Sequence, residues 1–391
     1  MRCTPFLKTQ LSAVVLALCI GGFFSSLRGA VLVVDPSMSA STIYGKAATL
    51  KPGDTLQFRG GTYPISFYCG INFCFPSGTS TLPVTLMPFP GEQAIIKPTS
   101  GLRVFNFAQT QSYIVLDGLV IDGTGVGYDC VQIEKPAHHI KIRNCEIKNF
   151  KYMGVNVGPD STFNEILTSK IHDGGMMSSG SGLNPGQFHA VYFSGKNNLV
   201  DACTIYNITG YGVHIYNGYA GNQSSNNLVK NSNIQNCGTY KVNGSSSAAG
   251  IILSSGSGNQ AIGNTLINNP YNIKIDYGAS ASLASLNKCS LAQNGTEILI
   301  GSGSFGAVVK DNCVDAAKIV NQGSTSSLSN NNPTACGGSV PPPPTNVDVS
   351  QQTQPPVYQP PTSQPSGPST SQVAAPFLIA GVIVAALIFS D

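Results

Sequence analysis

Residues 189–216, HAVYFSGKNNLVDACTIYNITGYGVHIY, contain one structural repeat and the beginning of the next. The triplet Val191-Tyr192-Phe193 returns as Val213-His214-Ile215, and an apolar segment, residues 199–205, lies between the two. A repeat at a fixed period determines the architecture of a whole chain, so the same period elsewhere in the sequence is the first feature to establish.

The rest of the chain repeats this pattern at intervals of roughly 23 to 34 residues. Each repeat contains a short apolar segment, and the last apolar residue of that segment recurs from repeat to repeat. These last residues predict a buried column: Ile121, Ile147, Ile171, Ile205, Ile234, Ile267, Leu291 and Val314. A second short strand with alternate inward residues follows each of the first seven: 131–133, 155–157, 191–193, 213–215, 251–253, 273–275 and 298–300. Short strands in coils of about 24 residues predict an all-β, parallel β-helix solenoid.

Polar residues recur two positions after the column. They predict a ladder of stacked side chains at one turn of every coil: Gly123, Asn149, Asp173, Asn207, Asn236, Asn269 and Gln293. Asn207 is also a glycosylation sequon, and we expect poor modification there if the ladder is buried. The better acceptors are Asn222 and Asn243, in lengthened loops, and the remaining sequon at Asn294.

Composition agrees with a stacked solenoid. Of 391 residues, 41% are hydrophobic and only 10% are charged, with 43 Gly and no Trp. The net charge of +3 is too small to indicate a nucleic-acid partner. Turns in such a chain would carry amides and hydroxyls instead of ions.

The two ends of the chain have compositions of their own. Residues 1–30 begin with Arg2 and Lys8, continue into an apolar run and predict a secretory signal peptide. Residues 337–372 predict a Pro/Ser/Thr-rich stalk, and the apolar residues 373–391 predict a signal for a glycosylphosphatidylinositol (GPI) anchor, with a single-pass helix as the alternative. Between them, residues 31–110 would form an N-terminal cap and the first coils, and 111–336 the repeats. We expect a monomer, anchored by lipid at the cell surface.

Nine cysteines remain after the signal peptide. In an oxidising compartment Cys69 with Cys74, and Cys313 with Cys336, are candidate disulfides. Cys145 and Cys203 share one predicted buried column two coils apart, too far for a disulfide, so we interpret them and Cys289 as core thiols.

Four segments resemble the opening coils of right-handed β-helix proteins, including chondroitinase-B-like and alginate-lyase-like polysaccharide lyases. They are LKPGDT (50–55), GGTY (60–63), PVTL (83–86) and SYIVLDGL (112–119). The resemblance covers about residues 45 to 325. It implies a right-handed single-stranded parallel β-helix of the pectin-lyase-like kind that acts on polysaccharide.

The candidate site lies where three long loops break the period, at 174–188, 217–225 and 237–249. The outward positions of the second strands are Gln132, Asn156, Tyr192, His214, Ile252, Lys274 and Leu299, and a neighbouring outward column holds Glu134, Gly158, Ser194, Tyr216, Ser254 and Asp276. Equivalent residues of adjacent coils lie about 5 Å apart, so Tyr192 and His214 should be neighbours.

These residue types suit β-elimination of a uronate. Asn156 or Lys274 would neutralise the carboxylate, His214 would be the base, and Tyr192 or Tyr216 the acid. His189 is a second candidate of the same kind as His214. No cofactor or metal is expected.

Two alternatives remain open. The first is a glycan-binding or adhesive rod without catalysis, which an open face at Tyr192, His214 and Lys274 would favour over a walled cleft. The second is a glycoside hydrolase, which needs two carboxylates roughly 5 to 10 Å apart. Glu134 and Asp276 share a column about five coils apart, which is too far.

Overall fold

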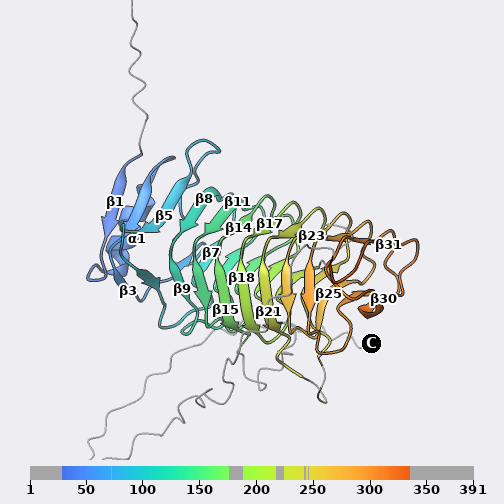
Figure 1. Cartoon of the computed structure of the whole chain (residues 1–391). Helices are drawn as coiled ribbons and strands as arrows, with labels where there is room; N and C mark the ends of the chain where they lie inside the picture. Colours follow the sequence, from blue (N-terminus) through green and yellow to red (C-terminus); the bar gives the residue numbers. More distant parts are fainter. Residues whose placement is uncertain are drawn as a thin grey trace, which may run out of the picture. The chain divides into compact units, whose positions relative to one another are not determined.

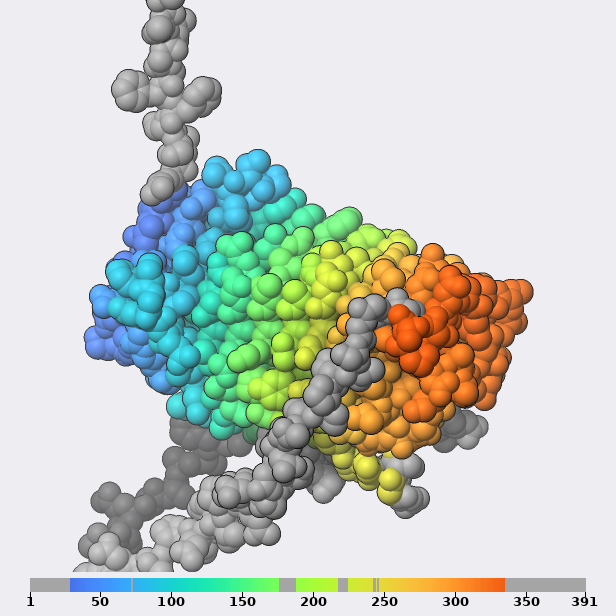
Figure 2. Space-filling model, in the orientation of Figure 1, coloured from blue at the N-terminus to red at the C-terminus, as the bar shows by residue number. Residues whose placement is uncertain are grey.

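The protein, described here from a computed structural model, consists of three parallel β-sheets whose strands alternate along the chain (Figure 1). The structure describes residues 29–71, 73–175, 188–216, 224–241, 244 and 246–334. All of them belong to the first of two units, Met1–Val340 and Pro341–Asp391. In Figure 2 the colours run broadly from blue at one end of the described coils to orange at the other, as expected when successive coils stack on one another.

Successive strands of the chain go to different sheets, which is the connectivity of a β-helix. The twelve-stranded sheet has the order β1 (Val31–Val34), β2 (Thr55–Phe58), β5 (Val84–Pro88), β8 (Ser112–Asp117), β11 (His138–Arg143), β14 (Glu165–Leu167), β17 (Leu199–Asp201), β20 (Leu228–Lys230), β23 (Gln260–Ile262), β26 (Leu283–Ser285), β29 (Val308–Lys310) and β31 (Ser327–Ser329). The nine-stranded sheet has the order β3 (Gly61–Tyr63), β6 (Ala94–Ile96), β9 (Val120–Asp122), β12 (Glu146–Lys148), β15 (Lys170–Gly174), β18 (Thr204–Ile208), β21 (Asn233–Cys237), β24 (Thr265–Ile267) and β27 (Lys288–Ser290).

The third sheet carries the candidate site. It is ten-stranded, with the order β4 (Phe67–Tyr68), β7 (Phe105–Phe107), β10 (Val131–Ile133), β13 (Val155–Val157), β16 (Val191–Phe193), β19 (Val213–Ile215), β22 (Ala249–Ser254), β25 (Tyr271–Asp276), β28 (Ile298–Ile300) and β30 (Ile319–Asn321). All seven predicted second strands lie in this sheet, and their pairing in register is confirmed.

Helix is scarce in the described residues. The helix α1 (Ala40–Ala48) begins at Ser39, whose hydroxyl accepts from the Thr42 N–H at 3.2 Å, and it buries Ile43 and Ala47 against the first coil. A 3₁₀ turn, η3 (Ala316–Lys318), precedes β30. In the part of the chain that is described, no helix is both long enough and apolar enough to cross a bilayer.

The predicted buried column is correct over its first five members and wrong at the next two. Ile121, Ile147, Ile171, Ile205 and Ile234 pair in register, but the next coils contribute Leu266 and Cys289 instead of Ile267 and Leu291. Leu291 is 53% exposed. In β24, Leu266 and Ile267 are adjacent and both apolar, and a shift of one residue moves a side chain to the opposite face.

The predicted amide ladder is half-buried or exposed from Asn149 onward, and its sixth member is Asn268 instead of Asn269. Asn149, Asp173, Asn207, Asn236 and Asn268 all have positive φ, between 53° and 58°, which Asn and Asp tolerate better than other side chains that carry a Cβ. Asn207 is exposed, and its amide donates to Asp173 at 3.0 Å. The residues of this ladder therefore occupy turn positions at which the chain changes direction.

Two other asparagine ladders, neither of them predicted from the sequence, are buried except at Asn331. In each step the backbone N–H and the side-chain N–H of one asparagine donate to the Oδ1 of the next, at 2.8 to 3.2 Å: Asn164, Asn198, Asn227 and Asn259 form one ladder, and Asn264, Asn287, Asn312 and Asn331 the other. These bonds satisfy backbone groups at turns that water does not reach.

Replacing Asn227 by alanine should lower the free energy of unfolding by at least about 3 kcal/mol, because it leaves more than one buried polar group without a partner at roughly 1 to 3 kcal/mol each. Asn227 accepts from the Asn198 N–H at 2.9 Å and donates to the Gly195 carbonyl at 3.0 Å. Chemical denaturation would measure the change. The matched control is Asn233→Ala at an exposed position of β21, with an expected cost under about 0.5 kcal/mol. Similar losses in the two variants would contradict the ladder's role.

The cysteines follow the prediction in part. Cys69 and Cys74 form the predicted disulfide. Cys145, Cys203 and Cys289 are buried, as predicted, although Cys289 belongs to the isoleucine column and not to that of Cys145. Cys313 is a buried thiol, and its predicted partner Cys336 lies outside the described residues.

Candidate functional site

The outer face of the ten-stranded sheet brings most of the predicted site residues together. The middle positions of β10, β13, β16 and β19 place Gln132, Asn156, Tyr192 and His214 side by side in consecutive coils. Buried valine, isoleucine and phenylalanine residues flank each of them and point into the core. The alternation therefore holds these four polar side chains outward.

A groove of about 560 Å³ lies over these strands. Besides those four middle positions, its described lining residues are Tyr152, Met153, Gly158, Pro159, His189, Ser194 and Tyr216. Five of the six predicted site residues, all except Lys274, therefore share one hollow. Much of the predicted loop walls, residues 176–187 and 217–223 together with 242, 243 and 245, lies outside the described residues.

Aromatic rings surround the His214 imidazole. The Tyr192 ring is 5.1 Å away and nearly perpendicular, at 80°, so the predicted neighbourhood of these two residues is present. The Tyr216 ring stacks on the imidazole at 5.5 Å and 15°, and the Tyr211 ring lies 4.7 Å away. Stacked and edge-on ring pairs of this kind hold an imidazole in one orientation.

His189 reaches the same place from the residues before β16. It is 2% exposed, and its Nε2 lies 2.9 Å from Nδ1 of His214. Its own Nδ1 accepts the backbone N–H of Tyr211 at 3.2 Å. The Nε2 of His214 is shielded from solvent and has no hydrogen-bond partner among the described residues.

Both imidazoles are held neutral. Burial lowers the pKa of His214 to about 3, and the positive charge of Lys274 acts in the same direction. Burial, and then the neighbouring His214, lowers the pKa of His189 well below its ordinary value. A charged imidazole cannot exchange its hydration for this apolar and aromatic surrounding without a large cost.

Lys274 does not line the groove. It belongs to β25, two coils beyond His214, and the buried Ile252 of β22 lies between them in register. Its ammonium is 3.5 Å from Asp276 and 3.4 Å from the Ser247 carbonyl, and the side chain is only 6% exposed. Of the two residues predicted to neutralise a carboxylate, Asn156 is the one that lines the groove.

A buried ion pair beside Asn156 was missed by the sequence analysis. Arg103 lies 3.1 Å from Asp129, which is 1% exposed and receives a long hydrogen bond, 3.5 Å, from Asn156. Burial raises the pKa of Asp129 to about 6 although Arg103 opposes the shift. Arg103 and Asp129 are separated by about one coil in the sequence, and this spacing could have predicted that the two charges lie next to each other.

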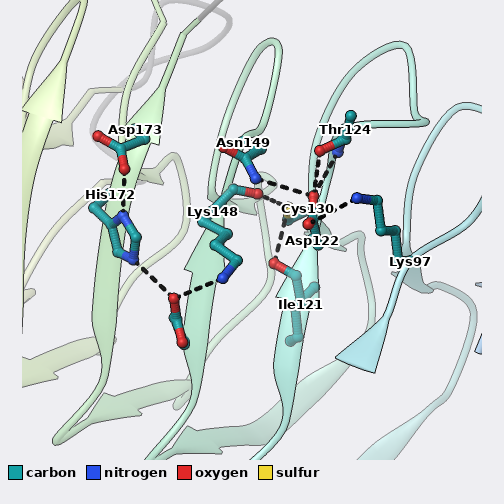
Figure 3. Close-up of polar contacts among 10 residues, drawn as sticks. Lys97, Ile121, Asp122, Thr124, Cys130, Lys148, Asn149, His172 and Asp173 are labelled. Carbon is teal, nitrogen blue, oxygen red and sulfur yellow. Dashed lines mark hydrogen bonds and ion pairs between the residues drawn. The ribbon is translucent and has the colours of Figure 1, made fainter. Parts of the chain in front are cut away.

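The histidines outside the groove have other surroundings. His172 of β15 contacts Asp173 at 2.8 Å and Glu146 at 3.2 Å on the nine-stranded sheet. Figure 3 shows this network and the one around Asp122 on neighbouring strands. His138 and His139 contact each other on the twelve-stranded sheet. Within the described ranges, no cluster of three or more His, Cys, Asp or Glu side chains is arranged to hold a metal ion.

The predicted modification sites fall mostly outside the described part of the chain. Asn294 is exposed, and its amide donates to the Ser246 carbonyl at 3.0 Å. Asn222, Asn243, residues 1–28 of the predicted signal peptide, and the predicted stalk and anchor segments, 337–372 and 373–391, lie outside it.

The buried histidines predict acid sensitivity. A histidine whose pKa is lowered by folding contributes stability above its unfolded pKa of about 6.5 and loses it as pH falls toward the folded value, with a slope of up to about 1.4 kcal/mol per pH unit. We expect the unfolding free energy to fall between pH 6.5 and 4, and His214→Gln to make that fall shallower. Denaturation at several pH values would measure both.

Asp129 acts in the opposite direction in this experiment. Its raised pKa stabilises the folded state at low pH, and that contribution disappears as pH rises through about 6. It should therefore offset part of the acid loss in wild type and variant alike. An identical pH dependence of the two proteins would contradict the burial of a neutral His214.

Comparison with known proteins agrees with this architecture. Residues 107–288 match the family model for the right handed beta helix region. The fold is that of a right-handed parallel β-helix, and the three parallel sheets and their connectivity agree with it. No curated protein sequence matches the chain.

The solved structures that resemble this chain include two lyases and an adhesin. The alginate lyase from Paenibacillus sp. str. FPU-7 superposes with a TM-score of 0.60 at 16% identity, over 77% of this chain and 99% of that one. Pectate lyase Pel9A gives 0.49 at 16% identity, over 73% and 80%. PfbA, a surface adhesin of Streptococcus pneumoniae, gives 0.46 at 13% identity, over 71% and 83%.

Proposed function

We propose that the protein acts on a uronate-containing polysaccharide as a lyase, by β-elimination in the groove of the ten-stranded sheet. The observation that carries the proposal is the neutral His214 imidazole against Tyr192 in a groove that also contains the Asn156 amide. The structural likeness to an alginate lyase supports the choice of a uronate.

The reaction needs three kinds of group. A base takes the proton from carbon 5, and the electrons of the broken C–H bond form the double bond between carbons 4 and 5. The glycosidic oxygen on carbon 4 leaves and takes a proton from an acid. The carboxylate must be neutralised so that the carbon 5 proton becomes acidic. The phenols of Tyr192 and Tyr216, the imidazole of His214 and the Asn156 amide supply these group types.

The second candidate is glycan binding without catalysis. It is favoured by the position of Lys274 outside the groove. No Lys or Arg occurs among the described residues that line the groove, so none of these residues supplies a positive charge to neutralise the carboxylate. The described lining also contains no Asp or Glu, and this argues against a hydrolase with two carboxylates.

Incubation of the β-helix domain with a panel of uronate and neutral polysaccharides tests the proposal. Unsaturated products detected by ultraviolet absorbance, from uronate polymers alone, are the expected result. Reducing ends without unsaturation would indicate hydrolysis. Binding without any product would favour the glycan-binding rod.

We further propose that the protein works outside the cell and is held there by a lipid anchor. The disulfide Cys69–Cys74 supports an oxidising compartment, and residues 1–30 and 373–391 support secretion and anchoring by their composition. Phosphatidylinositol-specific phospholipase C should release the protein from membranes. A mature protein that retains residues 373–391 would reject the anchor.

A further inference from the structure

The two histidines of the groove form a relay whose protons can be placed from one backbone group. The Tyr211 N–H can only donate, so Nδ1 of His189, 3.2 Å away, must carry a lone pair. A neutral His189 then has its proton on Nε2. This nitrogen lies 2.9 Å from Nδ1 of His214 and donates to it.

The same reasoning places the proton of His214. Its Nδ1 accepts from His189, so in the neutral ring the proton is on Nε2. This Nε2–H is the atom that lacks both solvent and a hydrogen-bond partner among the described residues. A buried donor without an acceptor is costly, and it calls for an acceptor that the described residues do not supply.

The surroundings of His214 do not change this assignment. Tyr192 of β16, Tyr211 and Tyr216 on either side of β19, and the apolar Ile252 of β22 face it. The remaining charge is that of Lys274, which disfavours a second proton on the ring. No described carboxylate contacts the imidazole to attract a proton to Nδ1 or to hold it charged.

We propose that Nε2–H of His214 donates a hydrogen bond to the carboxylate of a bound uronate, and that His189 is the positioning residue that keeps this proton in place. The inference rests on the proposed function for its substrate class. In this proposal His214 is a hydrogen-bond donor to the carboxylate, and not the base that the sequence predicted. Two neutral donors, His214 and Asn156, then take the place of a cation, which the described lining of the groove lacks.

A histidine side-chain ¹H–¹⁵N NMR spectrum of the protein tests the relay without any turnover. Signals assigned by the His214→Gln and His189→Gln variants should show neutral rings with the proton on Nε2 in both residues at neutral pH. A mannuronate oligosaccharide should shift the Nε2–H signal of His214, and a neutral oligosaccharide should not. A proton on Nδ1 of His214, or a charged ring, would overturn the proposal.

Two substitutions of His189 separate positioning from simple packing. In His189→Gln the amide can still accept from the Tyr211 N–H and donate to His214, so the tautomer should persist and mannuronate affinity should stay within about threefold. In His189→Glu the carboxylate accepts from both groups, which moves the His214 proton to Nδ1 and leaves a lone pair on Nε2. Affinity should then fall at least about tenfold at pH 8.

The pH dependence of His189→Glu completes the test. A nearby carboxylate raises the pKa of an imidazole, so acid should protonate His214 and restore the Nε2–H. Mannuronate affinity of this variant should therefore recover as pH falls from 8 to 5, while wild type changes little. Wild-type affinity of His189→Glu at pH 8 would overturn the proposal, and so would equal losses in the two variants. Absence of lyase products, with the NMR and binding results intact, would reject only the proposed reaction.

Discussion

His214→Ala should abolish turnover of a uronate polysaccharide and lower kcat/KM by about 10³-fold or more, the range seen when a proton-transfer group or a donor to developing charge is lost. The reason is positional. His214 is the ring around which Tyr192, Tyr211, Tyr216 and His189 are packed, and its Nε2 has no hydrogen-bond partner among the residues described. Initial rates of unsaturated-product formation would measure the loss.

The control for this substitution is His138→Ala, which removes an imidazole from the twelve-stranded sheet outside the groove and should leave the rate unchanged. Tyr192→Phe should slow the reaction but keep ring contacts with a sugar, whereas Tyr192→Ala should also weaken binding. A rod that only binds glycan gives another pattern. Wild type would then turn over nothing, Tyr192→Phe would bind normally, and Tyr192→Ala would bind weakly.

Gly158→Leu should block the groove and lower kcat/KM by about 100-fold, because even a displacement of about 1 Å at a reacting centre can cost that much. Gly158 lines the groove, as do Gln132 and Asn156. A Cβ there would meet only ordinary contacts, the nearest being the Ile133 carbonyl oxygen at 3.4 Å. The new side chain therefore occupies the space for substrate without straining the backbone, and kinetics with the preferred polymer would show it.

The same substitution elsewhere separates blocking from instability. Gly127 lies outside the groove, and a Cβ there would have one neighbour within 4 Å, the Gly101 carbonyl oxygen at 3.6 Å. Gly127→Leu should retain wild-type kinetics, and both variants should unfold at similar denaturant concentrations. A fully active Gly158→Leu protein would show that substrate binds somewhere else.

Particular residues show how far the sequence alone reaches in this fold. Inward residues of the second strands, such as Val191 and Val213, were identified because alternation within a repeat is a local property. Asn269 shows the limit. It was assigned to the surface ladder, but it is buried and accepts the Cys237 N–H at 3.0 Å, while Asn268 occupies the turn with positive φ. Two adjacent asparagines look alike in sequence, and only pairing with the previous coil distinguishes them.

The sequence by itself determined the solenoid, its period and the outward neighbours Asn156, Tyr192 and His214, because one strand spacing connects equivalent residues of successive coils. Only the tertiary structure decided the burial, the hydrogen-bond partners and the charged neighbours of those side chains. His189 meets His214 from the adjacent coil, Asp276 and Tyr271 hold Lys274 away from the groove, and the Arg103–Asp129 pair is buried beside Asn156. Burial and hydrogen bonds to other coils set these charges and protons, and both arise only when the coils are stacked.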